Sequence, residues 1–155
     1  MTWNNEMIFT AVLEQLAAGQ RVRLSGTGTS MEPTIHTDTD QLELAAPMEL
    51  QVGQICLYIR PQGGYAIHRI HKITPKGIVL VGDNQVKTET VCQNAVLAQV
   101  VAIHRASTTI DATTAAFLTA GYRANRQRLR RFHLQQLRYN LINFPRRIGK
   151  KLLKK

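Results

Sequence analysis

Short β-type runs separated by turn signals dominate the chain between residues 21 and 105. The runs are segments 21–24, 41–44, 55–59, 65–70, 78–81 and 95–104. Gly and Pro clusters separate several of them, as at residues 61–64 and 75–77. Strands of this length, repeated about every eight to twelve residues, indicate an all-β core rather than alternating strands and helices.

Helical patterns flank this core on both sides. Residues 5–18 place Val12 and Leu16 on one face at helical spacing, with Gly19 as a stop. The pattern becomes helical again from residue 111, and we expect Pro145 to end the main helix. The sequence therefore predicts two parts. Residues 1–110 form a β domain with an N-terminal helix, and residues 111–155 form a basic amphipathic helical tail outside the core.

The net charge of +10 comes from the tail alone. Residues 1–120 carry eight Lys or Arg and ten Asp or Glu, whereas residues 121–155 carry twelve Lys or Arg and no acid. A partner inferred from charge therefore belongs to the tail. Leucines between the charges favour an anionic membrane surface over nucleic acid, which needs the charge but not the leucines. A solvated basic extension without a partner is the alternative.

The remaining composition bears on cofactors and compartment. Cys56 and Cys92 have no metal-ligand spacing, so we expect neither a metal nor a cofactor. No stretch reaches the roughly 18 to 20 apolar residues of a spanning helix, and the N-terminus lacks a secretory signal. We therefore expect a cytoplasmic protein, at most lying on the inner surface of a membrane.

Ser30 lies in a segment that is suited to presenting a hydroxyl group. The segment 25–35 places this serine between a Gly/Thr run and Pro33. Glycine permits backbone conformations that other residues avoid and proline fixes φ, so the pair can hold a serine at a sharp, exposed turn. An ordinary surface loop is the plain alternative, because clusters of this composition usually form loops.

A nucleophilic serine needs a base, and His68 is the preferred candidate. It lies in the middle of a predicted strand, which fixes the direction of its side chain. His36 lies too near Ser30 in a polar turn, and His71 faces the opposite side if the strand continues. A half-buried strand histidine with a structural hydrogen bond is the plain alternative for His68.

Four segments occur in the order of the sequence boxes of a known peptidase family. They are Gly28–Thr34, Val52–Tyr58, Ala66–Ile70 and Gly82–Asn84, and together they resemble type I signal peptidases and the related S24/S26 serine peptidase superfamily. The His68-Arg69 pair resembles the archaeal and endoplasmic-reticulum branch, whereas the bacterial enzymes have Lys-Arg there. The resemblance covers roughly residues 22–105, and the ordered set is more specific than any single box.

The resemblance implies a fold, an activity and three site residues. The fold would be a small, strongly bent, β-barrel-like sheet. Ser30 would be the nucleophile and His68 the general base, while Asp83 would orient the base or brace the site. The substrate would be a peptide, leader or precursor protein, no cofactor would be needed, and the backbone N–H of Ser30 would stabilise the oxyanion.

The chain departs from the family pattern at several positions. Gly28 stands where many signal peptidases have a hydroxyl side chain as a second oxyanion donor, so Ser25, Thr27 or a backbone N–H would have to serve. The second acid of the His-type enzymes is missing, with Glu89 as a candidate replacement. Lys72 is the alternative base, because on a regular strand it shares the face of His68. We also expect an amphipathic helix in place of the N-terminal membrane anchor of signal peptidases.

Two functional hypotheses therefore stand. The first is a serine endopeptidase that uses Ser30 and His68. The second is a catalytically inactive peptidase-fold module that acts through its basic tail on a membrane or on nucleic acid. Hydrogen-bond reach between Ser30 Oγ and a nitrogen of His68 favours the enzyme, and a separation of about 6 Å or more favours the module.

Overall fold

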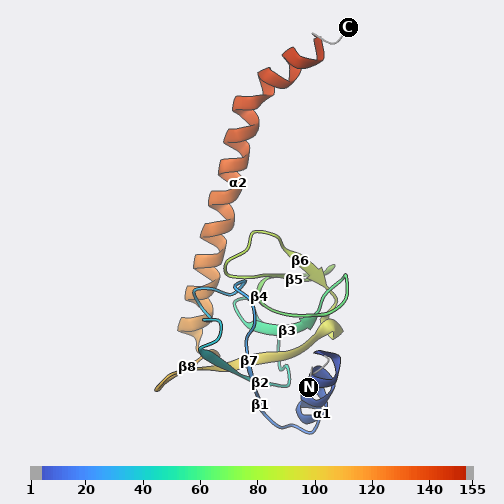
Figure 1. Cartoon of the computed structure of the whole chain (residues 1–155), viewed down its shortest axis with the longest axis vertical. Coiled ribbons are helices and arrows are strands. Elements are labelled where there is room, and N and C mark those ends of the chain that lie inside the picture. Colours follow the sequence, from blue (N-terminus) through green and yellow to red (C-terminus); the bar gives the residue numbers. More distant parts are fainter. Residues whose placement is uncertain (1–4, 153–155) are drawn as a thin grey trace.

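The computed structural model describes the backbone of residues 5–152 and the side chains of residues 9–140. Figure 1 shows a β-sheet body with a small helix at one side and a long helix that leaves it. The elements in chain order are α1 (Asn5–Ala17), β1 (Val22–Ser25), β2 (Asp40–Ala45), β3 (Ile55–Ile59), β4 (Tyr65–Thr74), β5 (Gly77–Val81), β6 (Glu89–Val91), the 3-10 helix η1 (Gln93–Ala95), β7 (Val96–Arg105), β8 (Thr108–Asp111) and α2 (Ala115–Leu152).

The strands of the described chain form one antiparallel sheet, which confirms the predicted β core. Their order is β1-β2-β7-β3-β4-β5-β6, and β8 also pairs with β7. Strand β7 is long enough to pair with β3 through residues 96–99 and with β8 through residues 102–105. The sheet is not closed, because β1 and β6 are the two ends of this order. A barrel is therefore not shown.

Two apolar clusters use opposite faces of β3, as the alternation of side chains along a strand requires. Ile55 and Leu57 belong to the larger cluster, to which α1 contributes Val12 and Leu16. Cys56 and Tyr58, which alternate with them along β3, belong to the smaller cluster together with residues of β4, β5 and β6. The predicted N-terminal helix and its apolar face are therefore confirmed.

The predicted tail is a single helix whose first half packs on the sheet. Leu118 and Leu129 are buried, and Asn125 is 2% exposed, so this half is not an extension outside the core. All side chains from residue 133 to residue 140 are exposed, where Figure 1 shows α2 projecting from the body. The prediction that Pro145 ends the helix is wrong, since α2 continues to Leu152. Side chains beyond residue 140 lie outside the described residues.

Candidate active site

Ser30 lies in the loop between β1 and β2. Hydrogen bonds from Asn84 and buried neighbours in the loop hold its main chain in place. Asn84 donates its backbone N–H to the carbonyl oxygen of Ser30 at 2.8 Å and its side-chain amide to that of Thr29 at 3.3 Å. Met31 and Ile35, which follow in the loop, are buried in the larger cluster. The serine is thus held on a loop with an apolar foundation and is not on a free surface turn.

Gly82 brings the serine loop and His68 together. A Cβ at this position would lie 2.5 Å from the carbonyl oxygen of Ser30 and 3.2 Å from His68 Nε2. Real Cβ atoms are not found within 3.0 Å of a backbone oxygen, so only glycine fits here. A side chain at residue 82 would therefore displace the serine loop or the imidazole.

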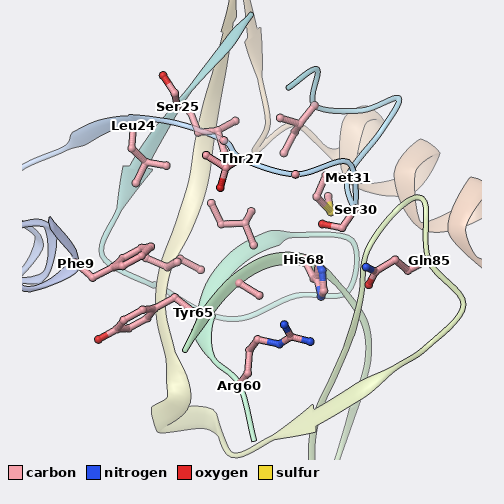
Figure 2. Close-up of a pocket in the computed structure, with 17 residues that line it drawn as sticks. Phe9, Leu24, Ser25, Thr27, Ser30, Met31, Arg60, Tyr65, His68 and Gln85 are labelled. Atoms are coloured by element: carbon pink, nitrogen blue, oxygen red, sulfur yellow. The ribbon is translucent and has the colours of Figure 1, made fainter. Parts of the chain in front are cut away.

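Ser30 and His68 line the same cavity, which has a volume of about 260 Å³. Figure 2 shows the serine hydroxyl directed into this cavity beside the imidazole ring. No hydrogen bond joins Ser30 Oγ to His68 within the described part of the chain. Catalytic hydrogen bonds are often longer in ligand-free enzymes than in their substrate complexes, so this geometry is compatible with a nucleophile and its base.

His68 is buried, and its other ring nitrogen is bound to a second side chain. Nδ1 lies 2.8 Å from the hydroxyl oxygen of Tyr58, which donates to Glu89 Oε2 at 2.7 Å. Arg60 pairs with the same carboxylate. Burial lowers the pKa of His68, because the charged imidazolium loses hydration, so the ring is a neutral base at neutral pH.

Asp83 does not contact His68 through any hydrogen bond in the described chain. It accepts hydrogen bonds from Nε and Nη2 of Arg69 and from the Thr34 hydroxyl at 2.6 Å, and the amide of Asn125 in α2 also donates to it. The carboxylate therefore ties the serine loop, β4 and α2 together. Of the two roles that the resemblance allowed, these contacts fit bracing of the site.

Apolar side chains line part of the rest of the cavity. Its lining includes Phe9, Leu24, Met31, Ile35, Leu42, Leu57, Tyr65 and Ile67. Figure 2 shows the hydroxyl of Thr27 directed into the cavity, whereas that of Ser25 points away from it. The backbone N–H of Ser30 donates no hydrogen bond among the described residues, and so it is available to a ligand.

The alternative bases lie elsewhere. Lys72 is exposed and does not line the cavity, because a β-bulge between Ile70 and Lys72 interrupts the alternation that would have placed it beside His68. The ring of His71 lies 5.8 Å from that of Tyr122, on the side of the sheet that α2 covers. His36 follows the serine in the same loop and is also absent from the cavity lining.

Sequence reasoning missed the roles of Tyr58 and Arg60 in this arrangement. Tyr58 belongs to an apolar run that reads as a core strand, and Arg60 precedes a turn. The only signal was the acid Glu89, which the resemblance to signal peptidases suggested as a replacement for a missing carboxylate. The sequence did not indicate that a tyrosine stands between this acid and His68.

Comparison with known proteins does not assign the chain. The sequence matches no model of a known protein family, and it matches no curated protein. No group of three or more metal-ligating side chains gathers among the described residues. None of the helices in the described part of the chain is long and apolar enough to cross a membrane.

Proposed function

We propose that this protein is a serine endopeptidase of the signal-peptidase-like S24/S26 type, with Ser30 as nucleophile and His68 as general base. The proposal rests on one observation above all: both side chains line one cavity, and Gly82 packs against both the serine main chain and the imidazole. A bent, barrel-like catalytic sheet is part of the same proposal. The order of the four sequence boxes supports it independently.

The reaction would proceed by acyl transfer. Ser30 Oγ forms a bond to the carbonyl carbon of the substrate, its proton passes to His68 Nε2, and the carbonyl π electrons move to oxygen. The Ser30 N–H would donate to this oxyanion, and the Thr27 hydroxyl would supply the donor that Gly28 lacks. The C–N bond then breaks as His68 gives the proton to the leaving amine. Water hydrolyses the acyl-enzyme by the same steps.

The cavity and the adjoining strand suggest how a peptide would bind. Strand β1 pairs only with β2 in the described sheet, so an extended peptide segment could pair with its other edge. The apolar lining favours an apolar side chain next to the cleaved bond. We therefore expect the substrate to be an unfolded or extended segment of a peptide, leader or precursor protein.

A serine-directed fluorophosphonate probe tests this function. We expect the probe to modify Ser30, identified by mass spectrometry, and expect Ser30→Ala and His68→Ala to abolish or strongly reduce the labelling. Ser25→Ala is the matched control, because it makes the same change at the end of β1, where the hydroxyl points away from the cavity. Undiminished labelling of Ser30→Ala would refute the proposal and favour the inactive module.

The exposed half of α2 favours a second proposal, binding to an anionic membrane surface. Leu134 and Leu137 are both 59% exposed there. Arg130, Arg131 and Arg138 lie on the same stretch and are also exposed. Each basic residue near an anionic surface contributes on the order of 1 kcal/mol, and the leucines would enter the interface. The surface that it binds would be the cytoplasmic face of the inner membrane.

Vesicle sedimentation with the full chain tests the second proposal. We expect binding to vesicles that contain phosphatidylglycerol and none to phosphatidylcholine alone. Leu134→Ala/Leu137→Ala should weaken vesicle binding without changing retention of duplex DNA. If the leucine variant binds vesicles as well as the parent, or if DNA is bound more tightly than vesicles, the tail is a nucleic-acid or non-specific basic extension instead.

A further inference from the structure

A chain of four buried or half-buried side chains ends at the base of the proposed active site. Arg60 pairs with Glu89, the carboxylate of Glu89 accepts from the Tyr58 hydroxyl at 2.7 Å, and the Tyr58 oxygen lies 2.8 Å from His68 Nδ1. Tyr58 is fully buried, and Glu89 and His68 are 7% and 4% exposed. Water is therefore largely excluded from the Tyr58–Glu89 and Tyr58–His68 hydrogen bonds.

The number of hydrogens on each group fixes the direction of each hydrogen bond. The Arg60 pairing, with further hydrogen bonds from Tyr58 and Gln62, lowers the pKa of Glu89 to about 2, so this carboxylate is ionised and can only accept. Tyr58 has a single hydroxyl hydrogen, and burial together with Glu89 raises its pKa, so it remains a phenol that donates to the carboxylate. The tyrosine oxygen is then left to accept a hydrogen bond from His68.

We propose that Glu89, acting through Tyr58, holds His68 in the tautomer that carries its hydrogen on Nδ1. The lone pair is thereby placed on Nε2, which lies beside Gly82 and the serine loop. Free neutral histidine prefers the opposite tautomer, so the protein has to impose this one. Tyr58 and Glu89 are positioning residues here, and no proton needs to leave either of them.

This assignment separates the roles of the two acids near the site. Asp83 already receives hydrogen bonds from Arg69, Thr34 and Asn125, and it has no bond to the imidazole in the described chain. Glu89 is the acid that reaches the ring, through one hydroxyl group. When His68 takes a proton at Nε2, its Nδ1–H stays bound to the Tyr58 oxygen, and the carboxylate behind it stabilises the imidazolium.

The catalytic meaning of this arrangement rests on the proposed peptidase function, but the tautomer does not. Long-range ¹H–¹⁵N NMR of the full chain distinguishes the two forms of a neutral histidine from the shifts of its ring nitrogens, and loss of the signal in His68→Gln assigns it. We expect wild-type His68 to be protonated at Nδ1 at pH 7.5. Protonation at Nε2 in the wild type would overturn the inference.

Glu89→Gln hardly changes the shape of the side chain. It tests the direction of the hydrogen bonds in the series Glu89, Tyr58 and His68, which we call the relay. Arg60 Nη2 and Gln62 donate to Oε1 alone, whereas Arg60 Nε lies 3.2 Å from both oxygens. The two donors at Oε1 should hold the oxygen of the new amide there and turn its NH₂ group toward Tyr58. Tyr58 must then accept from the amide and donate to His68 Nδ1. We therefore expect the tautomer to switch to Nε2–H, and an unchanged tautomer would refute the relay.

Two further variants complete the design. Glu43→Gln is the matched control, because Glu43 is also an ion-paired carboxylate but binds Arg21 and His104, remote from His68 in the hydrogen-bond network. It should leave the tautomer unchanged. Tyr58→Phe keeps the ring and removes the hydroxyl, so it should abolish the Nδ1–H preference, and its retention would contradict the inference.

Probe labelling in the same proteins keeps the two proposals apart. We expect Glu89→Gln to slow fluorophosphonate labelling of Ser30 at pH 7.5 by at least about tenfold, because general base catalysis contributes roughly 10² to 10⁴ in rate. A wild-type protein with the Nδ1–H tautomer but no labelling would refute the peptidase function and leave the relay standing. Labelling of a wild-type protein that has the Nε2–H tautomer would refute the relay and leave the peptidase function standing.

Discussion

The Arg69 guanidinium and the Asp83 carboxylate form a buried two-point ion pair behind the candidate active site. Nε and Nη2 of the arginine donate to the two carboxylate oxygens at 2.9 and 2.6 Å, and Nη1 donates to the Gly53 carbonyl. The arginine side chain is 1% exposed and the aspartate side chain 7%. Room for the guanidinium depends on Gly121 of α2, where a Cβ would overlap it. The pair thus joins β4, the Gly82–Asn84 turn and α2.

Asp83→Asn should be strongly destabilising. The substitution removes the negative charge and leaves the buried guanidinium of Arg69 uncompensated, which costs roughly 3 to 5 kcal/mol of unfolding free energy. Urea denaturation measures the effect. Asp38→Asn makes the same chemical change at an exposed aspartate in the serine loop and should change stability by less than about 0.5 kcal/mol. Equal stability of the two variants would show that the pair does not support the fold.

Gly82→Ala should separate the candidate nucleophile from the candidate base. The new methyl group would meet the Ser30 carbonyl oxygen, which also accepts from Asn84. Relief requires the serine loop or the turn to move, at a cost of about 1 to 3 kcal/mol, and Ser30 labelling should fall even where the protein is fully folded. Gly26→Ala is the control for folding, because its Cβ would make only ordinary contacts at 3.6 and 3.7 Å. Wild-type labelling in Gly82→Ala would contradict the assigned role of this glycine.

The fold was predictable where a strand carries its own signal. The six predicted runs correspond to β1, β2, β3, β4, β5 and β7. Strands β6 and β8 were missed, since Glu89–Val91 and Thr108–Asp111 are short and largely polar and become strands only by pairing with β5 and β7. The packing of α2 was also missed, because a run rich in arginine gives no sign that Leu118 and Leu129 are covered.

The candidate site was predictable only as far as the order of the sequence boxes reached. Ser30 and His68 do line one cavity, but the face of Lys72 depended on a bulge that the sequence does not reveal. The Tyr58 hydroxyl reaches His68 because β3 and β4 pair with Cys56 opposite His68, and this register brings residues ten positions apart together. In a hairpin this register is fixed by the type and length of the turn, which the composition of residues 60–64 does not specify by itself.

The pH dependence of Ser30 labelling should reflect the lowered pKa of His68. Burial is the main cause of the lowering, and Arg60 adds to it, while Glu89 and Asp83 oppose it. Only the neutral ring accepts a proton, so labelling should persist as the pH falls below about 6.5, the ordinary value for histidine. Labelling rates between pH 4.5 and 8, with circular dichroism as the control for folding, test this. A midpoint at or above pH 7 would contradict it.

The same burial should make stability fall as the pH is lowered from 7.5 to 5.5. The pKa values of His68 and His71 are both lowered, chiefly by burial. Below about pH 6.5 the unfolded chain binds protons at these positions that the folded chain does not, so the unfolding free energy decreases. Urea titrations at the two pH values measure the loss. His68→Gln should remove part of this pH dependence, and an unchanged dependence would show that His68 does not cause it.

The two cysteines should react at very different rates with a disulfide reagent. Cys92 is exposed, whereas Cys56 is fully buried, and burial raises the pKa of its thiol to about 12. Because the thiolate is the reactive form, we expect one thiol to react rapidly in the native protein and two in denaturant. Cys92→Ser should show no rapid native reaction.

Since Cys56 pairs with His68 across β3 and β4, slow modification of Cys56 would report opening of the strands that hold the candidate base. Rapid modification of Cys56 in the folded protein would mean that this part of the sheet is not closed to solvent.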